Sequence, residues 1–114
     1  MSASQRTKGA TYEREIVNQI KDTLGIDVSR NLTQTRDSGA DILLDGYVIE
    51  CKRRASISVY KWMEQAEDSC TFAQRPIVIC RGDGKGSLVI MNLEDFLPLL
   101  GNELNLHEPK RESL

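Results

Sequence analysis

The feature that most constrains this fold is a predicted β-hairpin over residues 40–52. Two apolar runs, 42–44 and 47–49, flank the dipeptide Asp45-Gly46. Such a dipeptide between two apolar runs is the strongest short-range signal for a two-residue hairpin turn. Both alternating faces of the hairpin carry apolar side chains, so we expect it to lie centrally in a sheet that is covered on both sides.

The turn length fixes which residues face each other across this hairpin. With residues 45 and 46 as the loop, counting outward places Asp41 directly opposite Glu50. Paired side chains have Cβ atoms about 4.5–5.5 Å apart, and like charges at that separation destabilise a sheet. A divalent cation is the natural compensation. Lys52 lies two residues after Glu50 and therefore projects from the same face.

The remaining apolar pattern predicts one α/β domain. The expected elements are a helix at about 10–24 ended by Gly25, a strand near 26–30, a loop at 31–39, the hairpin, a helix at 59–73 ended by Pro76, strands at 77–81 and 87–91 around a turn at 82–86, and a short helix capped by Asn92 and limited by Pro98. This order, αβββαββα, makes the strands on either side of the second helix parallel. We expect a mixed, mostly antiparallel sheet flanked by helices, a single domain over 1–114 with its core at about 8–100, and flexible ends at 1–7 and 102–114.

The first helix directs one acidic side chain toward the expected sheet. Glu13 lies three and four residues before Ile16 and Val17, on the apolar stripe, whereas Glu15 lies on the polar face. A carboxylate directed toward a core needs a partner. We expect Glu13 to approach the Asp41 cluster from the helix side, and the alternative is a helix-edge residue paired with an arginine.

Composition argues against several chemistries. The single histidine, His107, lies in a polar tail, which disfavours HNH nucleases, zinc hydrolases and Ser-His-Asp hydrolases. The three cysteines form no CxxC pair and are interpreted as reduced thiols. The net charge of −2 gives no global attraction to nucleic acid. No apolar run reaches the roughly 18 residues of a membrane span, so we expect a cytoplasmic protein with no membrane partner. We also expect no small-molecule cofactor.

Three motifs carry a resemblance to a known family. Asp41 followed by Glu50-Cys51-Lys52 resembles the D-(x)n-(D/E)-x-K signature of the PD-(D/E)XK nuclease superfamily, whose restriction-endonuclease-like αβββαβ core is similar to the order derived above. Residues 8–17, KGATYEREIV, and residues 60–67, YKWMEQAE, resemble segments of archaeal-type Holliday junction resolvases. The resemblance spans about residues 8–91. This chain is acidic, whereas the archaeal resolvases are basic.

The resemblance implies a metal-dependent DNA endonuclease that resolves four-way junctions as a homodimer, with Mg²⁺ as cofactor and Mn²⁺ as a substitute, encoded by a cell or a virus. It implies metal binding by Asp41, Glu50 and the Cys51 carbonyl, a metal-linked and catalytic role for Glu13, a catalytic Lys52, and Gln65 at the edge of the active site. The candidate DNA contacts are Lys8, Arg14, Arg36, Ser38, Arg53, Arg54, Tyr60 and Lys61, with Ser38 corresponding to a serine of the family's loop.

Other functions stay open at this point. One is a different PD-(D/E)XK nuclease, such as a nickase or a restriction-like or repair enzyme, and another is a catalytically inactive DNA-binding or interaction module on the same fold. At the residue level, the Asp41 cluster could be a surface salt-bridge group, Gln65 a helix cap, and Arg53 with Arg54 a solvated strand end. Trp62 and Met63 are expected in the core or in a dimer surface.

Overall fold

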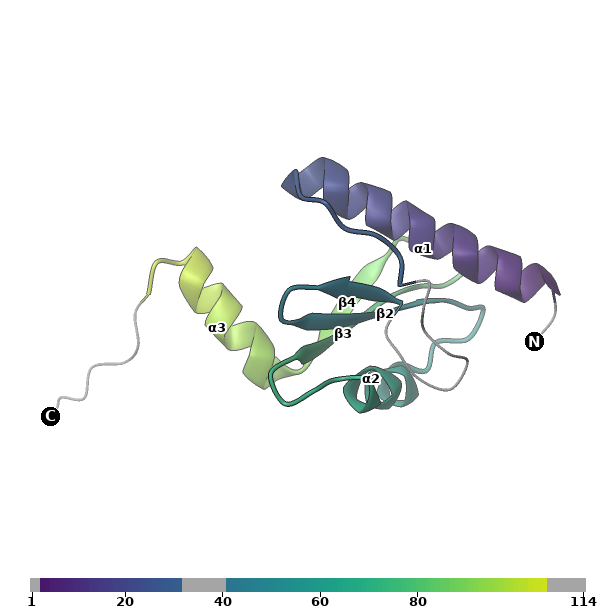
Figure 1. Ribbon diagram of the computed structural model, residues 1–114. Coiled ribbons are helices and arrows are strands. Elements are labelled where there is room, and N and C mark those ends of the chain that lie inside the picture. The colour runs from purple at the N-terminus through teal and green to yellow at the C-terminus, as the bar shows by residue number, and fades with distance from the viewer. Residues whose placement is uncertain (1–2, 32–40, 107–114) are drawn as a thin grey trace, which may run out of the picture.

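The computed structural model describes residues 3–31 and 41–106 (Figure 1). The elements in these ranges are α1 (Ala3–Leu24), β1 (Ile42–Leu44), β2 (Tyr47–Arg53), α2 (Val59–Asp68), β3 (Arg75–Arg81), β4 (Leu88–Met91) and α3 (Leu93–Glu103). The strands described form one sheet in the order β1-β2-β3-β4. β2 and β3 are parallel and joined through α2, while β1 with β2 and β3 with β4 pair antiparallel. The predicted α/β class, with a mixed and mostly antiparallel sheet flanked by helices, is confirmed.

The sheet separates two apolar layers, with α1 and α2 on opposite faces (Figure 1). On the α1 face, Tyr12 and Ile16 pack against Ile49. On the α2 face, Trp62 packs against Val78. Strand alternation therefore assigns the odd-numbered residues of β2 to the α1 face and the even-numbered ones to the α2 face. Trp62 and Met63, which were expected either in the core or in a dimer surface, are core residues.

The hairpin register agrees with the prediction. Ile42 pairs with Ile49 and Leu44 pairs with Tyr47, which leaves Asp45 and Gly46 as the turn. Gly46 has a φ of 80°, a conformation that glycine adopts without a steric penalty. Asp45 lacks the positive φ that a type I′ turn requires at both central residues, so the prediction of a two-residue turn of that type is wrong in the turn type and correct in the register. Because the turn is local, sequence alone was enough to fix the register of the strands that carry the candidate site.

The helix boundaries differ from the expected ones at several points. α1 begins at Ala3 rather than near residue 10, and it ends at Leu24. Gly25 follows it with a φ of 69°, and the Gly25 N–H donates to the Lys21 carbonyl at 2.8 Å. α2 ends at Asp68 rather than at 73. The Gln74 side chain accepts a hydrogen bond from the Thr71 N–H at 2.9 Å and holds a turn that leads directly into β3.

Residues 26–30 do not form the predicted strand. They pair with the sheet through a single antiparallel bridge between Arg30 and Ile42. Beside this bridge, the Asn31 N–H donates a hydrogen bond to the Asp41 carbonyl at 2.8 Å. Val28 is buried, whereas Asp27 and Ser29 are exposed residue types that favour turns. The segment therefore reaches the sheet only at its end. The expected loop falls largely at 32–40, outside the described residues.

Both prolines that were expected to end helices lie inside regular elements. Pro76 is the second residue of β3. The Arg75 N–H donates to Gly46 on the β2 side, so the Pro76 nitrogen faces β4, where pairing starts only at Ile77. The expectation that Pro98 limits α3 is wrong, because the helix continues through Pro98 to Glu103.

Candidate active site

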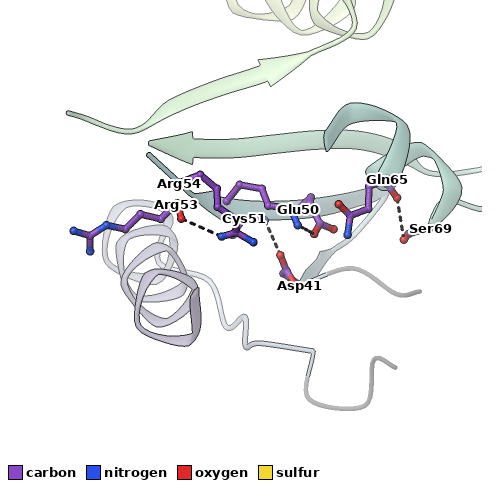
Figure 2. Close-up of polar contacts among 8 residues, drawn as sticks. Asp41, Glu50, Cys51, Arg53, Arg54, Gln65 and Ser69 are labelled. Carbon is purple, nitrogen blue, oxygen red and sulfur yellow. Dashed lines mark hydrogen bonds and ion pairs between the residues drawn. The ribbon is translucent and has the colours of Figure 1, made fainter. Parts of the chain in front are cut away.

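Asp41 lies immediately before β1, where the hairpin meets the segment that ends at Asn31. Its side chain is buried, with the residue 6% exposed. One carboxylate oxygen, Oδ2, accepts a hydrogen bond from the Cys51 N–H at 2.8 Å (Figure 2). The backbone of β2 therefore holds the Asp41 carboxylate beside Glu50 and Cys51, close to the position that the predicted register gave it.

Glu50 is a carboxylate buried in the middle of the sheet. It is 3% exposed and lies on the α2 face, beside Val78 of β3. Its Oε2 is 3.3 Å from the Lys52 ammonium, while its Oε1 has no hydrogen-bond partner among the described residues. Burial first, and the nearby Asp41 second, raise the pKa of Glu50 to about 7, although Lys52 opposes the shift. The interpretation as a surface salt-bridge group is wrong, because both carboxylates are buried.

Glu13 joins the same electrostatic group from α1. Burial raises its pKa, and the largest charge effect in the same direction comes from Asp41. Its Oε1 also forms an ion pair with Arg30 Nε at 2.9 Å. Both expectations for Glu13 therefore describe the molecule: it pairs with an arginine and it lies close to Asp41. The charge of Asp41 thus acts on both Glu13 and Glu50.

Cys51 stands between these carboxylates along β2. Burial raises the pKa of its thiol, and so do the charges of Asp41 and Glu13, in that order. The thiol is therefore a neutral core group of the α1 face. In a β-strand the N–H and C=O of one residue point to the same side, so the Cys51 carbonyl points toward the side on which Asp41 lies.

The α2 residues named as candidates differ in how they relate to this cluster. Gln65 is exposed, and its side chain points toward Glu50 in Figure 2. Its main-chain carbonyl accepts a hydrogen bond from the Ser69 hydroxyl at 3.3 Å, so its side-chain amide is not the group that makes this contact. Tyr60, which is 85% exposed, and Lys61 lie in the first turn of α2 and face solvent.

The candidate basic residues spread over several surfaces. Arg53 points away from Asp41 and Glu50 (Figure 2), as strand alternation predicted. Arg54 Nη1 donates to the Arg53 carbonyl at 3.0 Å, and Lys8 is 3.5 Å from Asp83. Arg14 is exposed on α1 and lines a hollow of about 280 Å³ together with Arg30. Arg36 and Ser38 lie outside the described residues.

Comparison with known protein families decides the class. Residues 4–107 match the family described as "Phage putative PDDEXK endonuclease". The chain belongs to this family. No curated protein and no solved structure gave a significant match. Membership places the chain in the PD-(D/E)XK superfamily and supports a nuclease, while the narrower resemblance to archaeal-type resolvases stays a prediction. None of the helices in the described ranges is both long and apolar enough to cross a membrane.

PD-(D/E)XK nucleases generally use divalent metals, so the residues of this chain can be tested for their fit to one. In the described part of the chain no three His, Cys, Asp or Glu side chains are grouped so that they could hold a metal ion by themselves. Mg²⁺, however, usually takes one or two carboxylates and keeps several waters. Asp41, Glu50 and the Cys51 carbonyl are hard oxygen donors of this kind. The unpartnered buried Oε1 of Glu50 is an acceptor that a cation would satisfy.

Three residues that the sequence did not single out lie near the candidate ones. Arg30 pairs with Glu13, and its only signal was its place at the end of an expected strand. Arg81 lies beside Arg53 in the parallel ladder, and Asp83 follows in the turn between β3 and β4. That turn is the hairpin connection expected at 82–86, and Gly84 has a φ of 72° there.

Proposed function

We propose that this chain is a metal-dependent DNA endonuclease that cuts branched DNA, most specifically four-way junctions, as a homodimer. The observation that supports the nuclease chemistry is the pair of buried carboxylates, Asp41 and Glu50, beside the partly buried Lys52. Burying two neighbouring carboxylates costs stability, and a bound cation would offset this cost. Membership of the phage endonuclease family supports the same reaction class.

Each residue of this group has a distinct proposed role. Asp41, Glu50 and the Cys51 carbonyl would hold Mg²⁺, or Mn²⁺ in its place, with Glu13 adjusting the charge around Asp41. When bound, the metal supplies an activated water and neutralises charge on the phosphate. Lys52 orients the attacking water or stabilises the developing charge. Gln65 lies at the edge of the site.

The proposed DNA contacts are the candidate basic and polar residues on both sides of this group. Lys8, Arg53 and Arg54 lie near the carboxyl end of β2, and Tyr60 with Lys61 lies on the exposed start of α2. Arg14, Arg36 and Ser38 complete the proposed set. Because the chain is acidic overall, binding depends on these local contacts rather than on net charge.

The homodimer follows from the symmetry of the substrate and from α3. Resolving a four-way junction requires two cuts, yet the chain has one D…ExK set, so two copies must act together. α3 buries none of its residues against the described part of the chain and stands apart from the sheet (Figure 1). Its leucines at 93, 97 and 100, together with Leu104 directly after its last residue, are 38–68% exposed and recur at alternating spacings of four and three. This spacing is typical of a helix that pairs with a second one, and the second copy of this chain is the proposed partner.

One gel assay tests the function. A mobile four-way junction, a duplex of equal length and a single strand are incubated with the protein in Mg²⁺, in Ca²⁺ and in EDTA. We expect paired symmetric nicks in the junction with Mg²⁺, binding without cutting with Ca²⁺, and no cutting in EDTA. Asp41→Asn provides the control for contaminating nucleases.

The other outcomes distinguish the alternatives. Equal cutting of junction and duplex, or a strict monomer on the junction by light scattering, would exclude the resolvase and leave a general PD-(D/E)XK nuclease. Full cutting in excess EDTA would exclude the metal site. Binding with no cutting in either metal would leave an inactive DNA-binding module.

A further inference from the structure

A second cluster of charged side chains lies on the α1 face, opposite to the candidate active site. Asp83, in the turn between β3 and β4, places one oxygen, Oδ1, between two cations. Lys8 Nζ of α1 is 3.5 Å from it and Arg53 Nε of β2 is 3.7 Å from it. Arg81 is the ladder partner of Arg53, so it lies on the neighbouring strand on the same face. We call Lys8, Arg53, Arg81 and Asp83 the basic cluster.

Arg81 is tied to this face by a second observation. Burial raises the pKa of Tyr12, while its hydrogen bond to Ser87 and, more weakly, the positive charge of Arg81 oppose this shift, which agrees with Arg81 on the α1 face. Tyr12 follows Lys8 by four residues on α1, which puts both on one side of the helix. The basic cluster is therefore assembled from α1, β2, β3 and the turn after β3.

The charges in the basic cluster do not balance. The cluster holds three cations and one carboxylate, Asp83, which pairs with Lys8 and Arg53 and is 52% exposed. The Nε atoms of Arg53 and Arg81 are both buried and make no hydrogen bond among the described residues. Unsatisfied guanidinium donors at a partly buried position are costly, and two adjacent arginines also repel each other. An anion with several acceptor oxygens would accept hydrogen bonds from the arginine side chains and would offset the repulsion between them.

We propose that the basic cluster binds a phosphate of the DNA backbone, and that Asp83 occupies the place of this phosphate in the free protein. This proposal rests on the proposed function for the identity of its ligand. Arginine binds phosphate through several parallel donors, and here two arginines are ladder partners on one face of the sheet. Asp83 is the exposed member and lies in a glycine-rich turn, so it can move aside when the phosphate enters.

The position of the basic cluster explains why a DNA phosphate fits better than an isolated anion. Arg53 directly follows Lys52 at the carboxyl end of β2, and the two side chains leave opposite faces of the sheet there. The basic cluster and the candidate active site therefore share one end of the sheet. A strand that passes over the carboxyl ends of β2 and β3 would therefore meet the active site and the basic cluster in close succession.

The test measures DNA binding without cleavage. Fluorescence anisotropy with a labelled four-way junction in EDTA compares the full chain with Asp83→Asn and Arg81→Gln over a range of salt concentrations. We expect Asp83→Asn to bind about threefold to tenfold more tightly, with a salt dependence steeper by about one phosphate contact. Arg81→Gln should weaken binding by a similar factor. The variant that carries both substitutions should gain less DNA affinity than Asp83→Asn alone.

Two matched variants control for the change in net charge. Asp45→Asn removes the same charge from the exposed turn between β1 and β2, where asparagine keeps the turn chemistry. Arg75→Gln removes an arginine from the opposite end of β3. Both should change affinity by less than twofold. Melting curves of Arg81→Gln check that it folds, and Asp83→Asn remains decisive if it does not.

The result separates this proposal from the proposed function. If Asp83→Asn binds no more tightly than Asp45→Asn, the phosphate site is overturned even when the wild type cuts junctions in Mg²⁺. If Asp83→Asn binds more tightly while the wild type cuts no DNA, the site stands and the nuclease proposal fails. Absence of DNA binding by both proteins at low salt would overturn both.

Discussion

Asp41 connects the two halves of the candidate site. Burial raises the pKa values of Glu13 and Glu50, and the charge of Asp41 is the second cause of the rise in both. Asp41→Asn keeps an oxygen that accepts the Cys51 N–H and removes that charge. We expect loss of cleavage together with a gain in metal-free stability of up to about 1 kcal/mol, or roughly 4 °C in Tm. Calorimetry in EDTA and the junction gel measure the two effects. A wild-type cleavage rate would show that the carboxylates are structural.

Lys52 and Arg53 are neighbours in the chain with opposite orientations. Lys52→Ala should reduce the cleavage rate by about 10² to 10³ with little loss of DNA affinity, because the ammonium acts on the reacting phosphate. Arg53→Ala should mainly weaken binding, and the weakening should change with salt concentration. Single-turnover cleavage and anisotropy separate rate from affinity. Equal kinetic defects in both variants would contradict the assignment of the two side chains to opposite faces.

At the scale of elements, the predictions that held are those that depend on local signals. The hairpin register follows from the two-residue turn at Asp45, and the end of α1 follows from Gly25. The identity and face of Asp41, Glu50 and Lys52 follow from the same register. These features need no information about the rest of the fold.

The features that the sequence missed depend on contacts between distant segments. α2 ends early because the Gln74 side chain holds a turn, and Pro76 is tolerated in β3 because its nitrogen faces the side where β4 is not yet paired. The basic cluster joins Lys8 to Asp83, which are far apart in the chain. No spacing rule brings such residues together, so tertiary structure alone reveals them.

α3 carries a prediction about assembly. Leu97→Glu places a charge in the centre of its exposed leucine stripe and should convert a dimer into a monomer. Asn102→Glu adds the same charge to the helix outside the stripe and should leave the dimer intact. Light scattering over a dilution series measures both. If Leu97→Glu remains dimeric, the two copies meet through another surface.

For the whole molecule, mixed dimers give the most direct view of cooperation between two sites. Wild-type and Asp41→Asn subunits with different affinity tags can be mixed and the heterodimer purified. We expect it to nick one strand of a four-way junction and to leave the paired strand intact, because each copy holds one complete site. Paired nicks from the heterodimer would mean that one subunit makes both cuts.

The hydrogen bond between the Tyr12 hydroxyl and Ser87, 2.7 Å long, joins residues 75 positions apart. During synthesis α1 is made first, but its packing surface includes β3, and its polar anchor lies beyond that strand. The helix can meet Ile42 and Ile49 once the hairpin has been made, but its packing surface and its polar anchor are complete only after residue 87. The hairpin with Asp41 and Glu50 is local and can pair well before then. The acidic centre of the molecule is thus expected to form ahead of the layer that encloses it.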